Sequence, residues 1–376
     1  MKISVVRLAA GLAATLAVAS AEGSSGIRIH TKNREPAAFQ AAIAAAAAAN
    51  PSGGPAPHIL GGTTAKSGEL PFIVLYNYVK PDGTGEQCGG SILDKNWILT
   101  AAHCVTGDGG VKLSSRQALI AAGITANDDF EKNFTRVSEI IVHEGFIPLD
   151  ENNSSDPKSL THDIALLRLE KPLTFSDKIK PIKISSTQFK TGTKFGVAGW
   201  GLYDITNPDP KKWKVAPQLL KTTVTGSVAD ACSQISPEYK SPNGRQICTI
   251  DQTTSSCMGD SGGPLYYKES NGDLTLAGLV SFGAQTDDKA PVCGSTLTPS
   301  FYTNAYSYRN WIATNMKVDV NTLLANSSSG NNNGGSGGND GNGGNGGNGG
   351  NSAVPGSSSF SGLALAAGLS FAAAMF

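Results

Sequence analysis

The sequence predicts an all-β fold for its central part, and two observations support that prediction. From Ile59 to about Met316, short runs of β-type residues alternate with turn-forming residues, and long helical periodicity is scarce. Glycine is also frequent, with 45 glycines among 376 residues, about 12% against the roughly 7% of an average protein. Part of this excess lies in the central region, as is typical of proteins in which many loops connect short strands.

The expected strands are five apolar runs, at residues 72–76, 97–99, 140–142, 164–169 and 276–282. Residues 304–316 have a different pattern, because Tyr308, Trp311, Ile312 and Met316 recur at three- and four-residue spacing. That spacing predicts one amphipathic helix at the end of the folded region.

Charge and cysteine usage narrow the class of protein. The chain has 30 Lys+Arg and 30 Asp+Glu, so no net charge attracts it to nucleic acid or to an anionic membrane. All six cysteines lie in the central region, and disulfides between them require an oxidising compartment. Six cysteines allow fifteen pairings, among which the count alone does not choose.

The N-terminal segments indicate secretion. Residues 1–21 have a charged start, an apolar core and the small-residue end Ala19-Ser20-Ala21, which is the pattern of a secretory signal peptide. A buried helix of the fold is the alternative. Residues 22–58 contain an alanine tract and a Pro/Gly-rich stretch with little to build a core, and we interpret them as a pro-segment.

The C-terminal segments predict a stalk and an anchor signal. Residues 317–352 are nearly all Gly, Asn and Ser from Ser327 on, and such a composition predicts disorder because it cannot bury enough apolar surface. Residues 353–376 end in an uncharged apolar tail, the pattern of a glycosylphosphatidylinositol (GPI) anchor signal, with Asn351 or Ser352 as the attachment residue. A membrane-spanning helix, which needs about twenty residues, and a dispensable tail are the alternatives.

Three segments of the central region contain side chains for nucleophilic catalysis. They are T-A-A-H-C at 100–104, H-D-I-A-L-L at 162–167 and G-D-S-G-G-P at 259–264. A serine hydroxyl is a weak nucleophile that needs a neighbouring base, and that base needs a carboxylate to fix its tautomer. The segments supply one group of each kind, in the order His103, Asp163, Ser261. The glycines beside Ser261 permit a sharp turn on which backbone N–H groups converge.

With these motifs, the region from Ile59 to about Met316 resembles a trypsin/chymotrypsin-type serine protease of peptidase family S1. The resemblance implies two six-stranded antiparallel Greek-key barrels, split near residue 175, and a C-terminal α-helix within residues 59–316. It implies that His103 is the general base, oriented by Asp163, and that Ser261 is the nucleophile. The N–H groups of Gly259 and Ser261 would form the oxyanion hole.

The resemblance also indicates the role of His162 and the pairing of the cysteines. His162 lies beside Asp163 but outside the T-A-A-H-C context, so it is not the expected base. The implied disulfides are Cys88–Cys104, Cys232–Cys248 and Cys257–Cys293. No zinc motif is present, and Ile124 and Lys132 stand where many relatives have calcium-binding glutamates. We therefore expect no metal and no other cofactor.

Residues 59–62 read I-L-G-G and match the start of mature family members. In the family, the new α-ammonium at this position pairs with the aspartate before the nucleophile, here Asp260. The resemblance therefore implies a zymogen that is activated by a cut between His58 and Ile59. The family usually has Arg or Lys before the cut, so His58 points to an activating protease other than the enzyme itself.

The pocket residues that the resemblance identifies predict the preferred substrates. Ser255, six residues before the nucleophile, lies at the pocket floor, where trypsin-type enzymes have Asp to bind Lys or Arg. Ser281 and Phe282 match the strand that pairs with substrate, and Gly283 leaves the pocket mouth open. Ser300 replaces a wall glycine and narrows the pocket. We expect cleavage after Phe, Tyr, Leu or Met.

The remaining expectations concern modification, partners and a second class of function. Glycan acceptor sequons begin at Asn133, Asn152, Asn153 and Asn326. The expected partners are protein or peptide substrates, an activating protease and protein inhibitors, with the chain itself a monomer, tethered to the cell surface only through its anchor and without nucleic acid. The alternative is a catalytically weak S1-like binding or inhibitor protein, but no triad residue is substituted. A surface adhesin would explain residues 327–376 and not the three motifs.

Overall fold

The structure is a computed structural model of the chain. It describes residues 59, 61–79, 85–149, 160–204, 213–227, 230–236, 238–251, 253–284, 293, 299–325 and 373–375. The expected signal peptide, pro-segment, Gly/Asn-rich stalk and most of the anchor signal lie outside these residues. So do His58, Asn152, Asn153, Asn326, Asn351 and Ser352.

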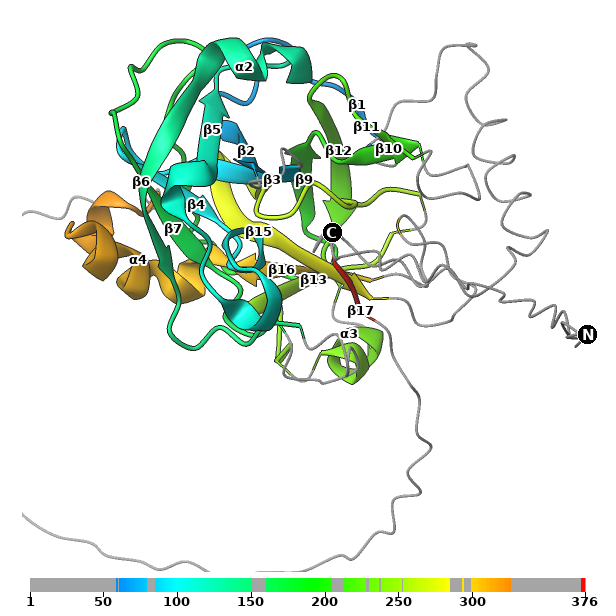
Figure 1. Ribbon diagram of the computed structural model, residues 1–376. Helices are drawn as coiled ribbons and strands as arrows, with labels where there is room; N and C mark the ends of the chain where they lie inside the picture. The colour runs from blue at the N-terminus through cyan, green and yellow to red at the C-terminus, as the bar shows by residue number, and fades with distance from the viewer. Residues whose placement is uncertain are drawn as a thin grey trace, which may run out of the picture.

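Six antiparallel strands close a barrel in the first half of the described chain (Figure 1). Around the barrel the order is β2 (Ile73–Val79), β3 (Gly85–Ile92), β4 (Trp97–Thr100), β7 (Ala165–Leu169), β6 (Phe134–Val142) and β5 (Ala118–Ala122). Its interior is filled by fully buried aliphatic side chains such as Val74, Ile98, Ile120 and Leu167. The apolar runs predicted as strands at 72–76, 97–99, 140–142 and 164–169 all lie in this barrel.

Strand β2 is apolar on both faces, because it has a core on each side. Val74 and Tyr76 point into the first barrel, whereas Ile73 and Leu75 belong to a cluster that also contains Trp200 and Leu279 of the second half. Successive side chains of a strand point to opposite faces, so the unbroken run at 72–76 serves the barrel and the contact between the halves. The functional groups described below lie near this contact.

The second half forms a longer sheet that also curves round a core. Its path is β1 (Thr63–Thr64), β12 (Leu220–Thr225), β9 (Lys194–Gly199), β14 (Pro264–Lys268), β15 (Leu274–Ala284), β16 (Ser300–Asn304) and β13 (Gln246–Thr249). A bridge between Gly226 and Thr249 connects the end of β12 to β13. The six strands from β12 to β13 therefore surround a second core that contains Phe195, Val197 and Phe301.

Three short strand pairings lie outside that path. Strand β8 (Lys183–Ile184) runs parallel to β15, and β10 (Leu202–Asp204) pairs with β11 (Lys214–Val215). Strand β17 (Ala373–Met375) runs antiparallel to β15 at Phe282–Ala284 (Figure 1). The short helices are η1 (His103–Val105), η2 (Asp108–Gly110), η3 (Ser115–Gln117), η4 (Asn127–Asp129), α2 (Phe130–Asn133) and α3 (Asp230–Ile235).

The predicted terminal helix is present as η6 (Ala305–Tyr308) followed by α4 (Arg309–Met316). Helix α4 buries Ile312, Ala313 and Met316 and ends where Lys317 adopts a left-handed conformation. No helix in the described part of the chain is both long and apolar enough to cross a membrane.

The folded region continues to Ala325, beyond the boundary at Met316 expected from the sequence. Helix η7 (Val320–Thr322) leads to Leu323, which is 5% exposed and belongs to the core shared by both halves. Ile184 donates a backbone hydrogen bond to Leu323 and accepts one from Ala325, at 2.8 and 2.9 Å. Residues 317–325 are thus not part of a disordered stalk, because one buried leucine and two backbone hydrogen bonds hold them. A single leucine does not change the composition of the segment enough to predict this order from the sequence.

Candidate active site

His103 is held at the end of the first barrel by local packing and by a disulfide. Strand β4 ends at Thr100, and two fully buried alanines lead into η1, which begins at His103. The next residue, Cys104, is bonded to Cys88 of β3. Small side chains and a cross-link therefore fix the backbone of His103, whose side chain is only 7% exposed.

Asp163 is fully buried and faces His103. Its Oδ1 accepts a hydrogen bond from the His103 backbone N–H at 2.9 Å, and its Oδ2 lies 2.8 Å from His103 Nδ1. Burial would raise the pKa of Asp163, but the charge of His103 and hydrogen bonds from His103 and Ser281 outweigh it and hold the pKa below its usual range. An ionised carboxylate only accepts hydrogen bonds, so Nδ1 of His103 carries a proton, and in the neutral imidazole Nε2 is the basic nitrogen.

Two residues of the second half also donate hydrogen bonds to Asp163. Ser281 Oγ on β15 donates to Oδ2 at 2.5 Å, and Thr303 Oγ1 on β16 donates to the backbone carbonyl at 2.8 Å. The sequence pattern places Ser281 on the strand that pairs with substrate but does not predict its bond to Asp163, and it indicates no role for Thr303. A lone Ser or Thr in a strand carries no sequence signal for such contacts.

Ser261 lies in a tight turn before β14. The Asp260 N–H bonds the Cys257 carbonyl, and the Gly263 N–H bonds the Asp260 carbonyl, at 3.0 and 2.9 Å. Gly259 has φ +93°, and a Cβ there would lie 3.0 Å from the backbone of Gly201. Glycine is therefore required at this position for both conformation and space.

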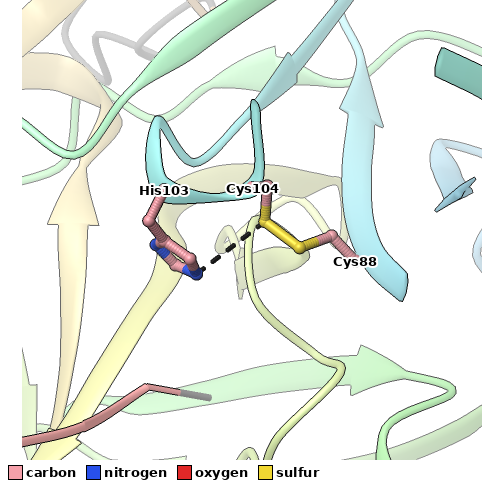
Figure 2. Close-up of side chains that lie close together, drawn as sticks. All are labelled: Cys88, His103 and Cys104. Carbon is pink, nitrogen blue, oxygen red and sulfur yellow. Dashed lines mark hydrogen bonds between the residues drawn. A yellow bond between two sulfur atoms is a disulfide. The ribbon is translucent and has the colours of Figure 1, made fainter. Parts of the chain in front are cut away.

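The hydroxyl of Ser261 is buried and has no hydrogen-bond partner within the described structure. His103 Nε2 instead lies 3.8 Å from Cys104 Sγ, beside the disulfide, as Figure 2 shows. His103, Cys88 and Cys104 approach closely enough to suggest a metal site. The two sulfurs are bonded to each other at 2.02 Å, so neither is a thiolate that could bind a metal.

Asp260, next to Ser261, is buried without a charged partner among the described residues. Its carboxylate oxygens accept the backbone N–H groups of Gly201 at 2.8 Å and Cys257 at 2.9 Å. Burial raises the pKa of Asp260 to about 7 despite these two bonds. Ile59, expected to become the new N-terminus, is 1% exposed and packs in the second core.

The expected pocket residues come together on the second sheet. Ser281, Phe282 and Gly283 lie on β15, and Gly283 is paired with Ser300 of β16. The ring of Phe282 stacks on Phe301, with centroids 4.7 Å apart. Ser255 is 4% exposed, and its hydroxyl has no hydrogen-bond partner in the described part of the chain.

The six cysteines form the three disulfides that the resemblance implied, Cys88–Cys104, Cys232–Cys248 and Cys257–Cys293. Asn133, the one expected glycan acceptor among the described residues, is exposed at the end of α2. Ile124, at one of the positions compared with the calcium-binding glutamates of relatives, lies in the core, and Lys132, at the other, is exposed.

Comparisons with known proteins agree with this architecture. Residues 59–312 match the sequence model of the Trypsin family. CLIP domain-containing serine protease B4 of Anopheles gambiae is 33% identical over 276 residues, covering 69% of this chain and 70% of that protein. The venom peptide isomerase heavy chain of Agelenopsis aperta is 31% identical over 271 residues, with coverages of 69% and 100%. Melanization protease 1 of Drosophila melanogaster is 30% identical over 283 residues, with coverages of 69% and 66%. The chain therefore belongs to the trypsin family of serine proteases and is a serine-type endopeptidase.

Proposed function

We propose that this serine protease is a secreted endopeptidase that cuts peptide bonds through an acyl-enzyme on Ser261. His103 is the general base, and Asp163 orients it. The observation that supports this assignment most directly is the buried His103–Asp163 pair, joined by two hydrogen bonds at 2.9 and 2.8 Å. In the neutral imidazole, that pairing places the single proton on Nδ1 and leaves His103 Nε2 able to accept one.

In the proposed reaction, Ser261 Oγ attacks the substrate carbonyl carbon while its proton passes to His103 Nε2. The backbone N–H groups of Gly259 and Ser261 stabilise the oxyanion that forms. The C–N bond then breaks, and the leaving amine takes the proton from Nε2. Water repeats the sequence and releases the acid. Hydrogen bonds between nucleophile and base are often long without substrate, so the absence of a partner for the Ser261 hydroxyl among the described residues does not argue against this role.

We further propose that the chain is made as a zymogen. Cleavage between His58 and Ile59 would create an α-ammonium, and Asp260 is the buried carboxylate that it would pair with. Support comes from Asp260 itself, because a buried carboxylate held only by neutral N–H groups is costly. Because His58 precedes the cut, the activating protease is expected to be a different enzyme.

For specificity we propose cleavage after Phe, Tyr, Leu or Met. Ser255 offers no charge to a Lys or Arg side chain, and a buried unpaired cation is strongly unfavourable. In a panel of fluorogenic peptides, kcat/KM for the apolar residues should exceed that for Arg and Lys by about a hundredfold, as expected for a loss of roughly 3 kcal/mol. Ser255→Asp is the matched variant and should shift the preference toward Arg and Lys. Fastest cleavage after Arg or Lys by the unaltered enzyme would contradict the assignment.

The proposed location of the enzyme, at the cell surface, rests on sequence segments outside the described structure. They are the signal peptide at 1–21, the pro-segment at 22–58, the stalk, and the anchor signal at 353–376 with attachment at Asn351 or Ser352. Release of the enzyme from intact cells by a phosphatidylinositol-specific phospholipase would support the GPI anchor. Retention after that treatment would favour a membrane-spanning tail.

The catalytic assignment is tested by labelling with a fluorophosphonate, which reacts with activated serines. The secreted chain should begin at Ile59 on N-terminal sequencing and should be labelled at Ser261. Ser261→Ala should abolish the label, whereas the exposed control Ser307→Ala should retain it. A correctly cleaved chain that takes no label would favour the alternative function, an S1-like binding or inhibitor protein.

A further inference from the structure

Two histidines that the catalytic scheme does not use, His143 and His162, stack on each other beside Asp163. Their ring centroids are 4.6 Å apart and their planes differ by 12°. Tyr308 packs edge-on against both rings, with centroid distances of 5.3 and 5.7 Å. The ring of Trp311 in α4 lies 5.1 Å from His143. The stack therefore joins the first barrel to the C-terminal helical segment.

The backbone at this stack is the turn that aims Asp163. His162 has φ 52°, a left-handed conformation that residues with a Cβ rarely adopt and that surrounding contacts must maintain. The Ile164 N–H bonds the His162 carbonyl at 2.8 Å, and the His143 N–H bonds the Ile164 carbonyl at 3.1 Å. The position of the two histidines is thus coupled to the backbone on both sides of Asp163.

The hydrogen bonds of the stack require both rings to be neutral. A guanidinium has only donors, so His162 Nε2, which lies 3.4 Å from a terminal nitrogen of Arg245, must accept. His162 Nδ1 then carries the proton toward the Tyr308 hydroxyl, 3.2 Å away. His143 Nδ1 accepts the Gly145 backbone N–H at 3.0 Å. A second proton on either ring would remove one of these acceptors.

The gap between the stack and Gly145 leaves little room for adjustment. A Cβ on Gly145 would lie 3.1 Å from His162 Cδ2 and 3.4 Å from His143 Nδ1. The rings are therefore confined between the glycine backbone and Tyr308, and they cannot separate freely when they become charged. Protonation would place two cations face to face, with the Arg245 guanidinium next to them.

Some of the charged groups around the stack raise the pKa of the two histidines, and others lower it. Glu144 accepts the Trp311 indole N–H at 2.9 Å, and Glu238 is ion-paired with Arg245. Burial lowers the pKa of both histidines. It outweighs Glu144 at His143, and Glu238 and Glu144 at His162; Arg245 lowers both pKa values further, and His143 also lowers the pKa of His162. Asp163, the nearest buried acid, is already engaged by His103 and Ser281.

We propose that the stacked His143–His162 pair is a positioning device for Asp163 that holds only while both imidazoles are neutral, so that acid loosens the turn and inactivates the enzyme. The role in activity rests on the proposed function of Asp163. The sign follows from linkage: a histidine whose pKa is lower in the folded state than the unfolded value of about 6.5 stabilises the fold above that pH, and the stabilisation is lost as pH falls.

The test measures kcat as a function of pH for the activated enzyme and for its His162→Asn variant. Each profile is normalised to its own plateau near pH 8. Asn tolerates a left-handed backbone, keeps one donor and one acceptor, and does not titrate. The variant should retain about tenfold more of its plateau kcat near pH 5.5, because residue 162 then takes up no proton and places no charge against His143, and KM should not change with it. The control Tyr306→Phe, at a neighbouring residue outside the stack, should follow the unaltered enzyme. Superimposable profiles for His162→Asn and the unaltered enzyme would overturn the proposal.

A second measurement does not depend on catalysis. In the Ser261→Ala chain, Tm should fall more between pH 8 and pH 5.5 than in the same chain with His162→Asn added. Equal losses of Tm would show that the stack is not acid-sensitive and would overturn the proposal. A difference in Tm together with a cleaved but inactive enzyme would instead refute the proposed function and leave the acid sensitivity of the stack established.

Discussion

The two halves of the molecule differ in how fully the buried polar groups that they contribute to the candidate active site are hydrogen-bonded. On the first barrel, every polar atom of the Asp163 carboxylate is bonded, to His103 and to Ser281. On the second half, the hydroxyls of Ser255 and Ser261 are buried and have no hydrogen-bond partner among the described residues, where Asp260 is bonded only by neutral N–H groups.

This difference has a physical meaning. A buried polar group without a partner costs about 1–3 kcal/mol. Among the described residues four side-chain hydroxyls are in this state: those of Tyr76 and Ser91 lie in the first barrel, and those of Ser255 and Ser261 lie at the candidate site. The first barrel thus provides a finished acid–base pair. The second half holds the groups that substrate, in the case of Ser255 and Ser261, or activation, in the case of Asp260, would complete.

The largest expected effect is the loss of kcat when the hydrogen-bonded His103–Asp163 pair is disrupted. Asp163→Asn places an amide N–H toward His103 Nδ1 and forces the wrong tautomer, so kcat should fall by about 10⁴-fold, the size known for this change in a related protease. KM should change little, since Asp163 does not touch substrate. Steady-state kinetics of the activated enzyme measure both constants. The control is Asp177→Asn, at a fully exposed carboxylate, and a loss below tenfold would show that Asp163 does not fix the tautomer.

A smaller effect is expected from the contact by which the second half supports the first. Ser281→Ala removes the hydroxyl that donates to Asp163 Oδ2 at 2.5 Å. Hydrogen bonds to charged groups contribute about 1.5–3 kcal/mol, but the bonds from His103 remain, so kcat should fall by about tenfold. Ser307→Ala, which removes an exposed hydroxyl bonded to the Gly244 carbonyl, is the matched control. Unchanged kcat in Ser281→Ala would mean that the first barrel positions Asp163 unaided.

The last effect concerns the second half and appears in stability rather than in kcat. Burial raises the pKa of Asp260 from 3.8 to about 7, so the folded chain keeps a proton that the unfolded chain loses between these values. Stability of the uncleaved chain therefore falls as pH rises through that window, by up to roughly 4 kcal/mol. Pairing with a new ammonium at Ile59 should remove most of this loss.

The measurement uses Ser261→Ala with a site for a sequence-specific protease placed directly before Ile59. Cleavage should raise Tm more at pH 7.5 than at pH 5, by several degrees for a domain of this size. The same chain carrying Asp260→Asn should show no such pH-dependent gain. An equal gain at both pH values in the Asp260 chain would indicate that Ile59 and Asp260 do not pair.

Local patterns in the sequence predicted much of the fold. Strands β2, β4, β6, β7 and β15 and the helical segment from Ala305 to Met316 coincide with apolar runs that need no knowledge of distant residues. Residues 317–325 were assigned to the stalk because their order depends on Leu323 and on backbone bonds to Ile184, far away in the chain. The end of the fold is therefore a tertiary property.

The candidate site divides in the same way. The motifs around His103, Asp163 and Ser261 name the groups and the chemistry, because nucleophile, base and orienting acid must be of those residue types. The Ser281 hydroxyl bonds an aspartate 118 residues earlier in the chain, and the His143–His162 stack depends on Tyr308 and Arg245. These contacts exist only after the two halves and the C-terminal segment pack together, since they join residues that no local pattern relates.

The sequence by itself therefore determined the all-β class, the family resemblance and the identity of the reactive groups, because each is written in short contiguous motifs. The tertiary structure alone decided which of those groups are hydrogen-bonded, which are buried without a partner among the described residues, and which histidines lie beside Asp163. Hydrogen bonding and burial depend on atoms brought together from distant parts of the chain, and that proximity is created by folding.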